Sequence, residues 1–181
     1  MANLLFLEDL HPGQIWTSPQ RTISADDVSL FASLTGDHTP LHTAASEPSE
    51  RLPFGRPIVH GLLGMSIMAG LSSEHPRVST LALLRVGEWE FLKPIYFGET
   101  VHVVTEIEST ENYGRRAGRV KWQRRLMSAD QQVLQAGQIE TIVARRTPLP
   151  RELRQEVGVD QARSIESDVV PAPREIPAGN W

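Results

Sequence analysis

The segment from Gly61 to Leu71 most limits how this chain can fold, because its residues are apolar or small on every side. A helix with one apolar stripe needs one covered face, whereas a helix that is apolar all round must be enclosed by the rest of its domain. The segment is shorter than the roughly 20 apolar residues that a membrane span needs. The sequence therefore predicts a helix that is buried on every side and wrapped by other elements.

Alternating apolar and polar residues in the second half of the chain predict the elements that enclose this helix. A period of two is typical of strands with one buried face, as between Val101 and Ile107 or between Val120 and Leu126. Gly137 marks a possible bulge in the last of these strands. The expected strands are 81–91, 101–107, 120–126 and 132–144.

A shorter helix is predicted earlier in the chain. Ser24 followed three residues later by Asp27 has the spacing of a capping box, and it predicts a helix from about Ala25 to Leu34. Residues 37–50 then indicate an ordered loop with room for another short helix. Helical segments followed by hairpin-linked strands predict an α+β domain, in which an antiparallel sheet curls around one buried helix.

The length of 181 residues favours a single domain with a substantial core. We expect this domain to comprise residues 1–146. From 147 to 181 the chain is rich in proline and charge and poor in aromatic residues, which predicts a tail that is partly helical or extended.

Charge and cysteine content narrow the possible functions. The formal net charge is -4 with both signs interspersed, which argues against a nucleic-acid partner. The absence of cysteine excludes disulfides, thiolate metal sites and a thiol nucleophile. The first residues lack the basic start of a signal peptide, so we expect a cytoplasmic protein without a membrane partner.

A carboxylate and an imidazole, those of Asp37 and His42, lie close together in the loop, and Pro40 stiffens the path between them. Hydration at the carbon β to a thioester needs a base for the water and an acid for the α carbon, and Asp and His can divide these tasks. Spacing alone also allows Asp37 to cap a turn and His42 to be a hydrogen-bonded wall residue. The spacing matches no zinc signature, so no metal is expected.

The second candidate segment runs from Phe54 to Gly61, directly into the predicted buried helix. A glycine at a helix start leaves its backbone N–H unobstructed, and the helix dipole favours negative charge there. Such a donor could stabilise a thioester oxygen as it gains charge in an enolate-like transition state. Alternatively, Gly61 only permits close packing and His60 satisfies a buried polar position.

Taken together, residues 31–42 and 54–63 resemble the hydratase segment of MaoC-like proteins, and residues 91–101 resemble the strand, turn and strand that follow it. The resemblance covers roughly residues 10–144. It implies a hotdog fold, a homodimer or dimer of dimers, and R-specific hydration of an enoyl-CoA thioester, or the reverse dehydration. No cofactor is implied beyond the coenzyme A of the substrate.

The resemblance also assigns roles to residues. It implies that Asp37 and His42 are catalytic and that Gly61 is the donor to the thioester oxygen. The chain departs from the family at Thr39, where the motif usually has Asn. Residues beside the motif positions are expected to contact the substrate: Pro40, Ile58, Val59, His60 and Leu62.

Three functions therefore remain to be separated. The first is an enoyl-CoA hydratase or dehydratase, which the paired motifs favour. The second is a hotdog thioesterase, which would hydrolyse the thioester carbonyl instead of hydrating the alkene. The third is a catalytically silent hotdog module that binds acyl-CoA or a partner chain.

Overall fold

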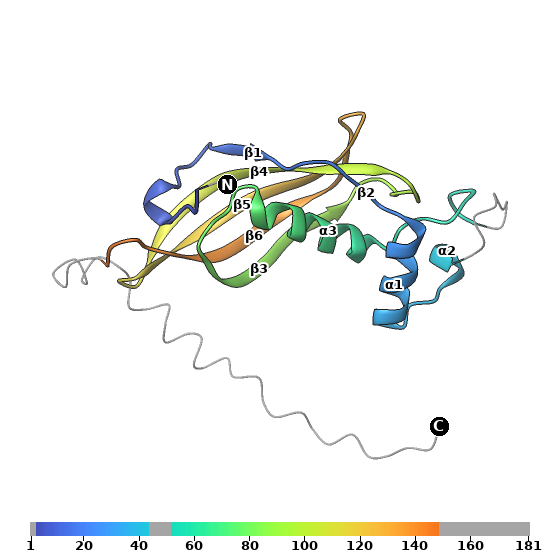
Figure 1. Ribbon diagram of the computed structural model, residues 1–181, viewed down its shortest axis with the longest axis horizontal. Helices are drawn as coiled ribbons and strands as arrows, with labels where there is room; N and C mark the ends of the chain where they lie inside the picture. The colour runs from blue at the N-terminus through green and yellow to red at the C-terminus, as the bar shows by residue number, and fades with distance from the viewer. Residues whose placement is uncertain (1–2, 44–51, 149–181) are drawn as a thin grey trace, which may run out of the picture.

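The computed structural model describes residues 3–43 and 52–148. The elements in chain order are the 3₁₀ helix η1 (Leu7–Asp9), β1 (Ile15–Thr17), β2 (Arg21–Thr22), α1 (Ala25–Thr35), α2 (Pro40–Thr43), α3 (Gly61–Glu74), β3 (Thr80–Phe91), β4 (Thr100–Tyr113), β5 (Ala117–Ser128) and β6 (Val133–Ala144). The strands form one antiparallel sheet in the order β1-β4-β5-β6-β3, with β2 also paired to β4. Figure 1 shows α3 lying along this sheet, while α1 and α2 lie together at one end.

All four predicted strands are present, and buried residues of β4, β5 and β6 share one core with α3. Val103 on β4 and Leu126 on β5 pair directly in the sheet, and both are fully buried. They belong to one hydrophobic core with Leu63, Ile67 and Met68 of α3. The predicted α+β arrangement, an antiparallel sheet packed against a central helix, is confirmed.

The bulge predicted at Gly137 lies instead in the neighbouring strand. Gly137 pairs regularly with β5, whereas β3 has an extra residue between its pairing positions Gly87 and Glu90. The irregular stretch of β3 brings Trp89 against Gly137, where an added Cβ would lie 2.5 Å from the indole ring. The glycine therefore marks a close approach of a large side chain to the backbone.

The prediction that α3 is buried on every side is wrong for the single chain. Its sheet-facing residues Leu63, Gly64 and Ile67 are buried, but Leu62 is 61% exposed and Ser66 is also exposed. The sheet of one chain covers one side of the helix and leaves the other side open.

The edge strand β3 is also uncovered. Five large apolar side chains along it are between 40% and 63% exposed, namely Leu81, Leu83, Leu84, Val86 and Phe91. An edge strand with open backbone groups and apolar side chains is a surface that readily pairs with another chain.

The predicted helix after Ser24 is confirmed together with its capping box. The Asp27 N–H donates to the Ser24 hydroxyl oxygen at 3.1 Å, and the Ser24 N–H donates to the Asp27 carboxylate at 2.9 Å. The helix ends at Thr35 and is capped by Gly36, whose φ of 77° suits a residue without a side chain. Asp37 follows directly and is thereby placed at the end of α1.

The strands β1 and β2 and the helix η1 are additions that the sequence patterns do not predict, since each is only two or three residues long. Of the tail predicted from 147 to 181, residues 149–181 lie outside the described residues, so a division at 146 stays a prediction.

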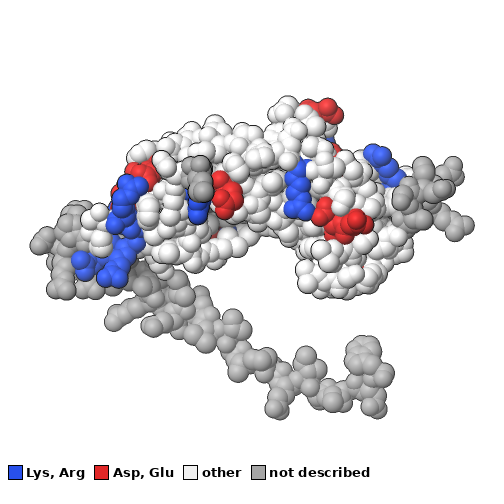
Figure 2. All heavy atoms as spheres, in the orientation of Figure 1, with Lys and Arg blue, Asp and Glu red and all other residues white. Residues whose placement is uncertain are grey.

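Among the described helices, none is both long enough and apolar enough to cross a membrane. On the face drawn in Figure 2, groups of Lys and Arg atoms and of Asp and Glu atoms are scattered and in places lie next to each other, and most of the face is uncharged.

Candidate active site

The Asp37 carboxylate is held by its near neighbour Thr39. The Thr39 hydroxyl donates to Oδ1 of Asp37 at 2.5 Å, and the Thr39 N–H donates to the same oxygen at 3.2 Å. Both bonds favour the ionised form and so lower the pKa of Asp37 below its usual value. The bond from the Thr39 hydroxyl has the larger effect, and the bond from the Thr39 N–H follows. The Asp37 side chain is 45% exposed, so a carboxylate with one engaged oxygen faces the open side of the site.

His42 is oriented by a backbone carbonyl. It lies in the short helix α2, and its Nδ1 is 2.8 Å from the carbonyl oxygen of Ile58. A carbonyl only accepts, so Nδ1 carries the hydrogen of this bond. In the neutral ring the lone pair is then on Nε2, which can accept a hydrogen bond or a proton.

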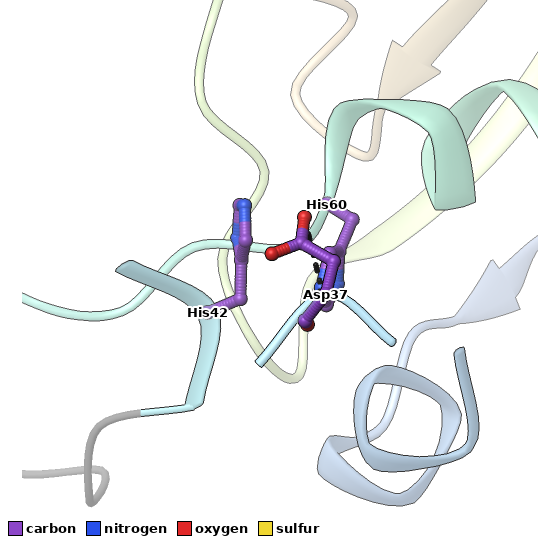
Figure 3. Close-up of side chains that lie close together, drawn as sticks. All are labelled: Asp37, His42 and His60. Atoms are coloured by element: carbon purple, nitrogen blue, oxygen red, sulfur yellow. Dashed lines mark hydrogen bonds and ion pairs between the residues drawn. The ribbon is translucent and has the colours of Figure 1, made fainter. Parts of the chain in front are cut away.

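His60 contacts both of the other two residues and is almost completely buried, with 3% exposure. Its Nε2 donates to the backbone oxygen of Asp37 at 3.0 Å and is 3.8 Å from Oδ2 of the Asp37 carboxylate. Its ring stacks on that of His42, with ring centroids 3.9 Å apart. Figure 3 shows these three side chains converging from the segment after α1, from α2 and from the segment that leads into α3.

Gly61 is the first residue of α3, and the surrounding side chains approach it closely. An added Cβ would lie 2.9 Å from two atoms of the Phe91 ring. Its carbonyl oxygen accepts a 3.0 Å hydrogen bond from the side-chain amide of Gln135 on β6. No hydrogen bond among the described residues uses the Gly61 N–H, so this donor at a helix start is available to a ligand.

The remaining predicted substrate contacts lie around this centre in different environments. Pro40 begins α2, and Ile58 supplies the carbonyl that holds His42. Val59 is buried in the core, and its N–H donates to the carbonyl of Ile95. Leu62 is exposed beside Gly61. Contacts between these residues and a substrate stay predictions.

The same three side chains also have a geometry that could hold a cation. One ligand atom from each of Asp37, His42 and His60 falls within 4.8 Å of the others. Each histidine, however, already uses one ring nitrogen on a backbone carbonyl. The two nitrogens left for a metal are Nε2 of His42 and Nδ1 of His60, and the latter is buried.

Several contacts that organise the site were not predicted from the sequence. In the sequence Thr39 is only a departure from the family motif, whereas in the structure it holds the Asp37 carboxylate. Gln135 and Phe91 reach Gly61 from β6 and β3, and no local pattern marks them. The pairing of β3 with β6, which sets Phe91 opposite Gln135, is what brings them together.

Comparison with known proteins identifies the family. The family model described as "MaoC like domain" matches residues 9–125, which are more than half of the chain. The chain belongs to the MaoC-like domain family. This MaoC-like chain is 31% identical to Protein MaoC of Klebsiella aerogenes over 98 residues, which are 54% of this chain and 29% of that protein. It thus spans less than a third of that relative. It is 30% identical to the 3-hydroxybutyryl-CoA dehydratase of Methylorubrum extorquens over 115 residues, covering 63% of this chain and 71% of that one.

Solved structures confirm the hotdog fold of this MaoC-like chain. It superposes on a monoamine oxidase regulatory protein from Archaeoglobus fulgius with a TM-score of 0.73 at 24% identity, covering 83% of this chain and 99% of the other. It also superposes on a Mycobacterium tuberculosis protein described as having a double hotdog fold, with a TM-score of 0.68 at 19% identity, covering 96% of this chain and 53% of the other.

Proposed function

We propose that the chain catalyses the hydration of a 2-enoyl-CoA thioester to a 3-hydroxyacyl-CoA, or the reverse dehydration, with R stereochemistry. The observation that carries the proposal is the convergence of the Asp37 carboxylate and the His42 imidazole within 4.8 Å, next to the start of α3. The 3-hydroxybutyryl-CoA dehydratase among its relatives supports the same class of reaction.

The proposed chemistry divides the protons between the two side chains. Oδ1 of Asp37 is engaged by Thr39, which leaves Oδ2 to take a proton from the attacking water. As the oxygen of this water bonds to the β carbon, the protonated Nε2 of His42 gives a proton to the α carbon. A proton then passes from Asp37 to His42 and restores both groups, so that the net change is the addition of one water.

The thioester oxygen gains negative charge while the β carbon is attacked. We place this oxygen at the N–H of Gly61, where the start of α3 favours negative charge. Because the polar atoms of Asp37 and His42 lie within 4.8 Å of one another, we expect the water and the proton to reach the same face of the alkene. The proposal is therefore a syn addition.

We also propose that the working enzyme is a homodimer. The open side of α3 and the uncovered edge β3 are apolar surfaces that one chain leaves exposed. A second copy related by a twofold axis would cover both surfaces at once and remove a free sheet edge.

The decisive experiment follows the loss of enoyl absorbance with crotonyl-CoA, together with the release of free thiol and chiral analysis of the product. The parent is expected to lose enoyl absorbance without thiol release and to form the R product. Thiol release would indicate a thioesterase, and the absence of both signals over a panel of linear, branched and dicarboxylic enoyl thioesters would indicate a silent binding module.

Variants of the two catalytic candidates connect the activity to this site. Asp37→Asn and His42→Ala are each expected to lower kcat by at least about 100-fold, the lower range of general acid–base contributions. The double variant should be little worse than either one, because groups that act as a unit are not additive. Asp26→Asn on α1 and His11→Ala are matched controls. Treatment with a chelator should leave the parent rate unchanged, and a chelator-sensitive rate would indicate a metal at these residues.

A further inference from the structure

We propose that His60 is a positioning residue, which aligns Asp37 and His42 with each other and with Gly61 and does not itself contact the substrate. This inference rests on the proposed function and adds a role within the same site. It is carried by two contacts of the buried His60 ring, with Asp37 and with His42, and by the peptide bond from His60 to Gly61.

The first contact fixes the backbone of Asp37. Among the described residues, the other hydrogen bonds of the segment from Asp37 to Thr39 join neighbours no more than five residues apart. The bond from Nε2 of His60 to the Asp37 carbonyl instead joins residues 23 positions apart. It is therefore the hydrogen bond that sets the position of the Asp37 loop relative to the start of α3.

The second contact fixes the plane of His42. The rings of His60 and His42 are stacked at 3.9 Å with an angle of 26° between their planes. Phe31 of α1 packs against the His60 ring at 5.2 Å, which limits its movement. The stacking and the bond from Nδ1 of His42 to Ile58 together determine where Nε2 of His42 points.

The third connection is covalent, because His60 is bonded directly to Gly61. The residue that holds the Asp37 loop and the His42 ring therefore also precedes the proposed donor to the thioester oxygen. A displacement of about 1 Å between reacting groups can cost roughly 100-fold in rate, so a common anchor for all three groups matters for catalysis.

The hydrogen bonds of His60 also argue against a direct role in proton transfer. Its Nε2 hydrogen is donated to a carbonyl, and its Nδ1 is buried without a hydrogen-bond partner among the described residues. With 3% exposure the ring presents almost no surface to a substrate. Removing its contacts should therefore affect kcat more than KM.

Two substitutions separate the contacts. His60→Gln keeps a side-chain N–H that can reach the Asp37 carbonyl but loses the stacked ring, whereas His60→Phe keeps the ring and loses the hydrogen bond. In the full-length protein with crotonyl-CoA, each is expected to lower kcat about 10- to 100-fold and to change KM by less than about threefold. His60→Phe should add little to Asp37→Asn, because both act on the same group.

A spectroscopic readout tests the same proposal independently of activity. Nitrogen NMR of histidine-labelled protein, recorded at a pH where the His42 ring is neutral, should show one tautomer in the parent, with hydrogen on Nδ1, and a tautomer mixture in His60→Gln. Phe31→Leu leaves the His60 side chain in place but loosens the packing around it, and it should lower kcat severalfold. This variant provides the test if the His60 variants do not fold.

Unchanged kcat in folded His60 variants, or a raised KM at unchanged kcat, would overturn the proposal, the latter by showing a substrate contact. An unchanged His42 tautomer in the NMR spectrum of His60→Gln would also overturn it. If the parent hydrates no thioester, the proposed function fails, and the NMR result still decides whether His60 orients His42.

Discussion

The hydroxyl group of Thr39 donates a hydrogen bond to Oδ1 of Asp37, and the Thr39 backbone N–H donates a second one to the same oxygen. One oxygen of the carboxylate is thereby engaged, while the other accepts no hydrogen bond among the described residues and lies 3.8 Å from Nε2 of His60. Where the MaoC-like motif usually has an asparagine, this chain thus supplies a hydroxyl donor from a shorter side chain. The contact has a consequence for pH dependence.

Thr39→Val removes the hydroxyl donor while keeping the shape of the side chain. Since this hydrogen bond is the largest cause of the lowered pKa of Asp37, the pKa should rise toward its ordinary value of about 4. The proposed base works as a carboxylate, so activity is lost as pH falls through its pKa. The acid limb of kcat/KM should therefore move to higher pH in Thr39→Val.

The measurement is a pH profile of kcat/KM, with circular dichroism at each pH to confirm that the protein stays folded. Thr110→Val on β4 is the matched control, and its acid limb should coincide with that of the parent. An acid limb that shifts to lower pH in Thr39→Val would contradict the assignment of Asp37 as the base.

Gly61→Ala is expected to lower kcat/KM by about 10- to 100-fold. This is less than the effect of removing an oxyanion donor altogether, because alanine keeps the backbone N–H and only displaces it. The new Cβ would lie 2.9 Å from the Phe91 ring, so either the ring or the start of α3 must move. Since Phe91 is a half-exposed side chain, the fold should tolerate the change.

The double variant Gly61→Ala/Phe91→Ala removes the clash and should recover part of the activity that Gly61→Ala alone loses. Gly70→Ala, also in α3 but with open space around it, is the control. It should retain activity and gain roughly 0.5–1 kcal/mol of stability from the better helix former. Equal activity of Gly61→Ala and the parent would remove Gly61 from the site.

Gln135→Leu is expected to separate activity from stability. The change removes the hydrogen bond to the Gly61 carbonyl and also removes a buried side-chain oxygen without a hydrogen-bond partner among the described residues. These two effects oppose each other, so the melting temperature should change by only a few degrees. The kcat should fall severalfold, because the first turn of α3 loses its link to β6. A large loss of stability at unchanged kcat would show that Gln135 serves only the fold.

Leu83→Lys on β3 is expected to weaken the proposed homodimer. The side chain is exposed in the single chain, whereas in a dimer formed through this edge the charge would be buried against the second copy. Light scattering at micromolar concentration should give at least twice the 20.2 kDa chain mass for the parent and a lower mass for the variant. Ile15→Lys, on the opposite edge strand β1, is the control. A parent that is monomeric and still hydrates substrate would contradict the dimer.

Local sequence patterns determined much of the secondary structure. The capping box of Ser24 and Asp27 fixed the start of α1, because its hydrogen bonds join residues three apart. The alternation from Val101 to Ile107 identified β4 and its buried face. The candidate pair Asp37 and His42 was found because its motif is contiguous and resembles that of a known family.

Tertiary structure alone decided how the candidate site is held together. The bonds from His42 to Ile58, from His60 to Asp37 and from Gln135 to Gly61 join residues 16, 23 and 74 positions apart. It likewise decided that the bulge lies in β3 and that α3 is covered on one side by its own chain. Such relationships depend on which segments pack together and in what register, and a sequence pattern records only the preferences of residues that are near one another along the chain.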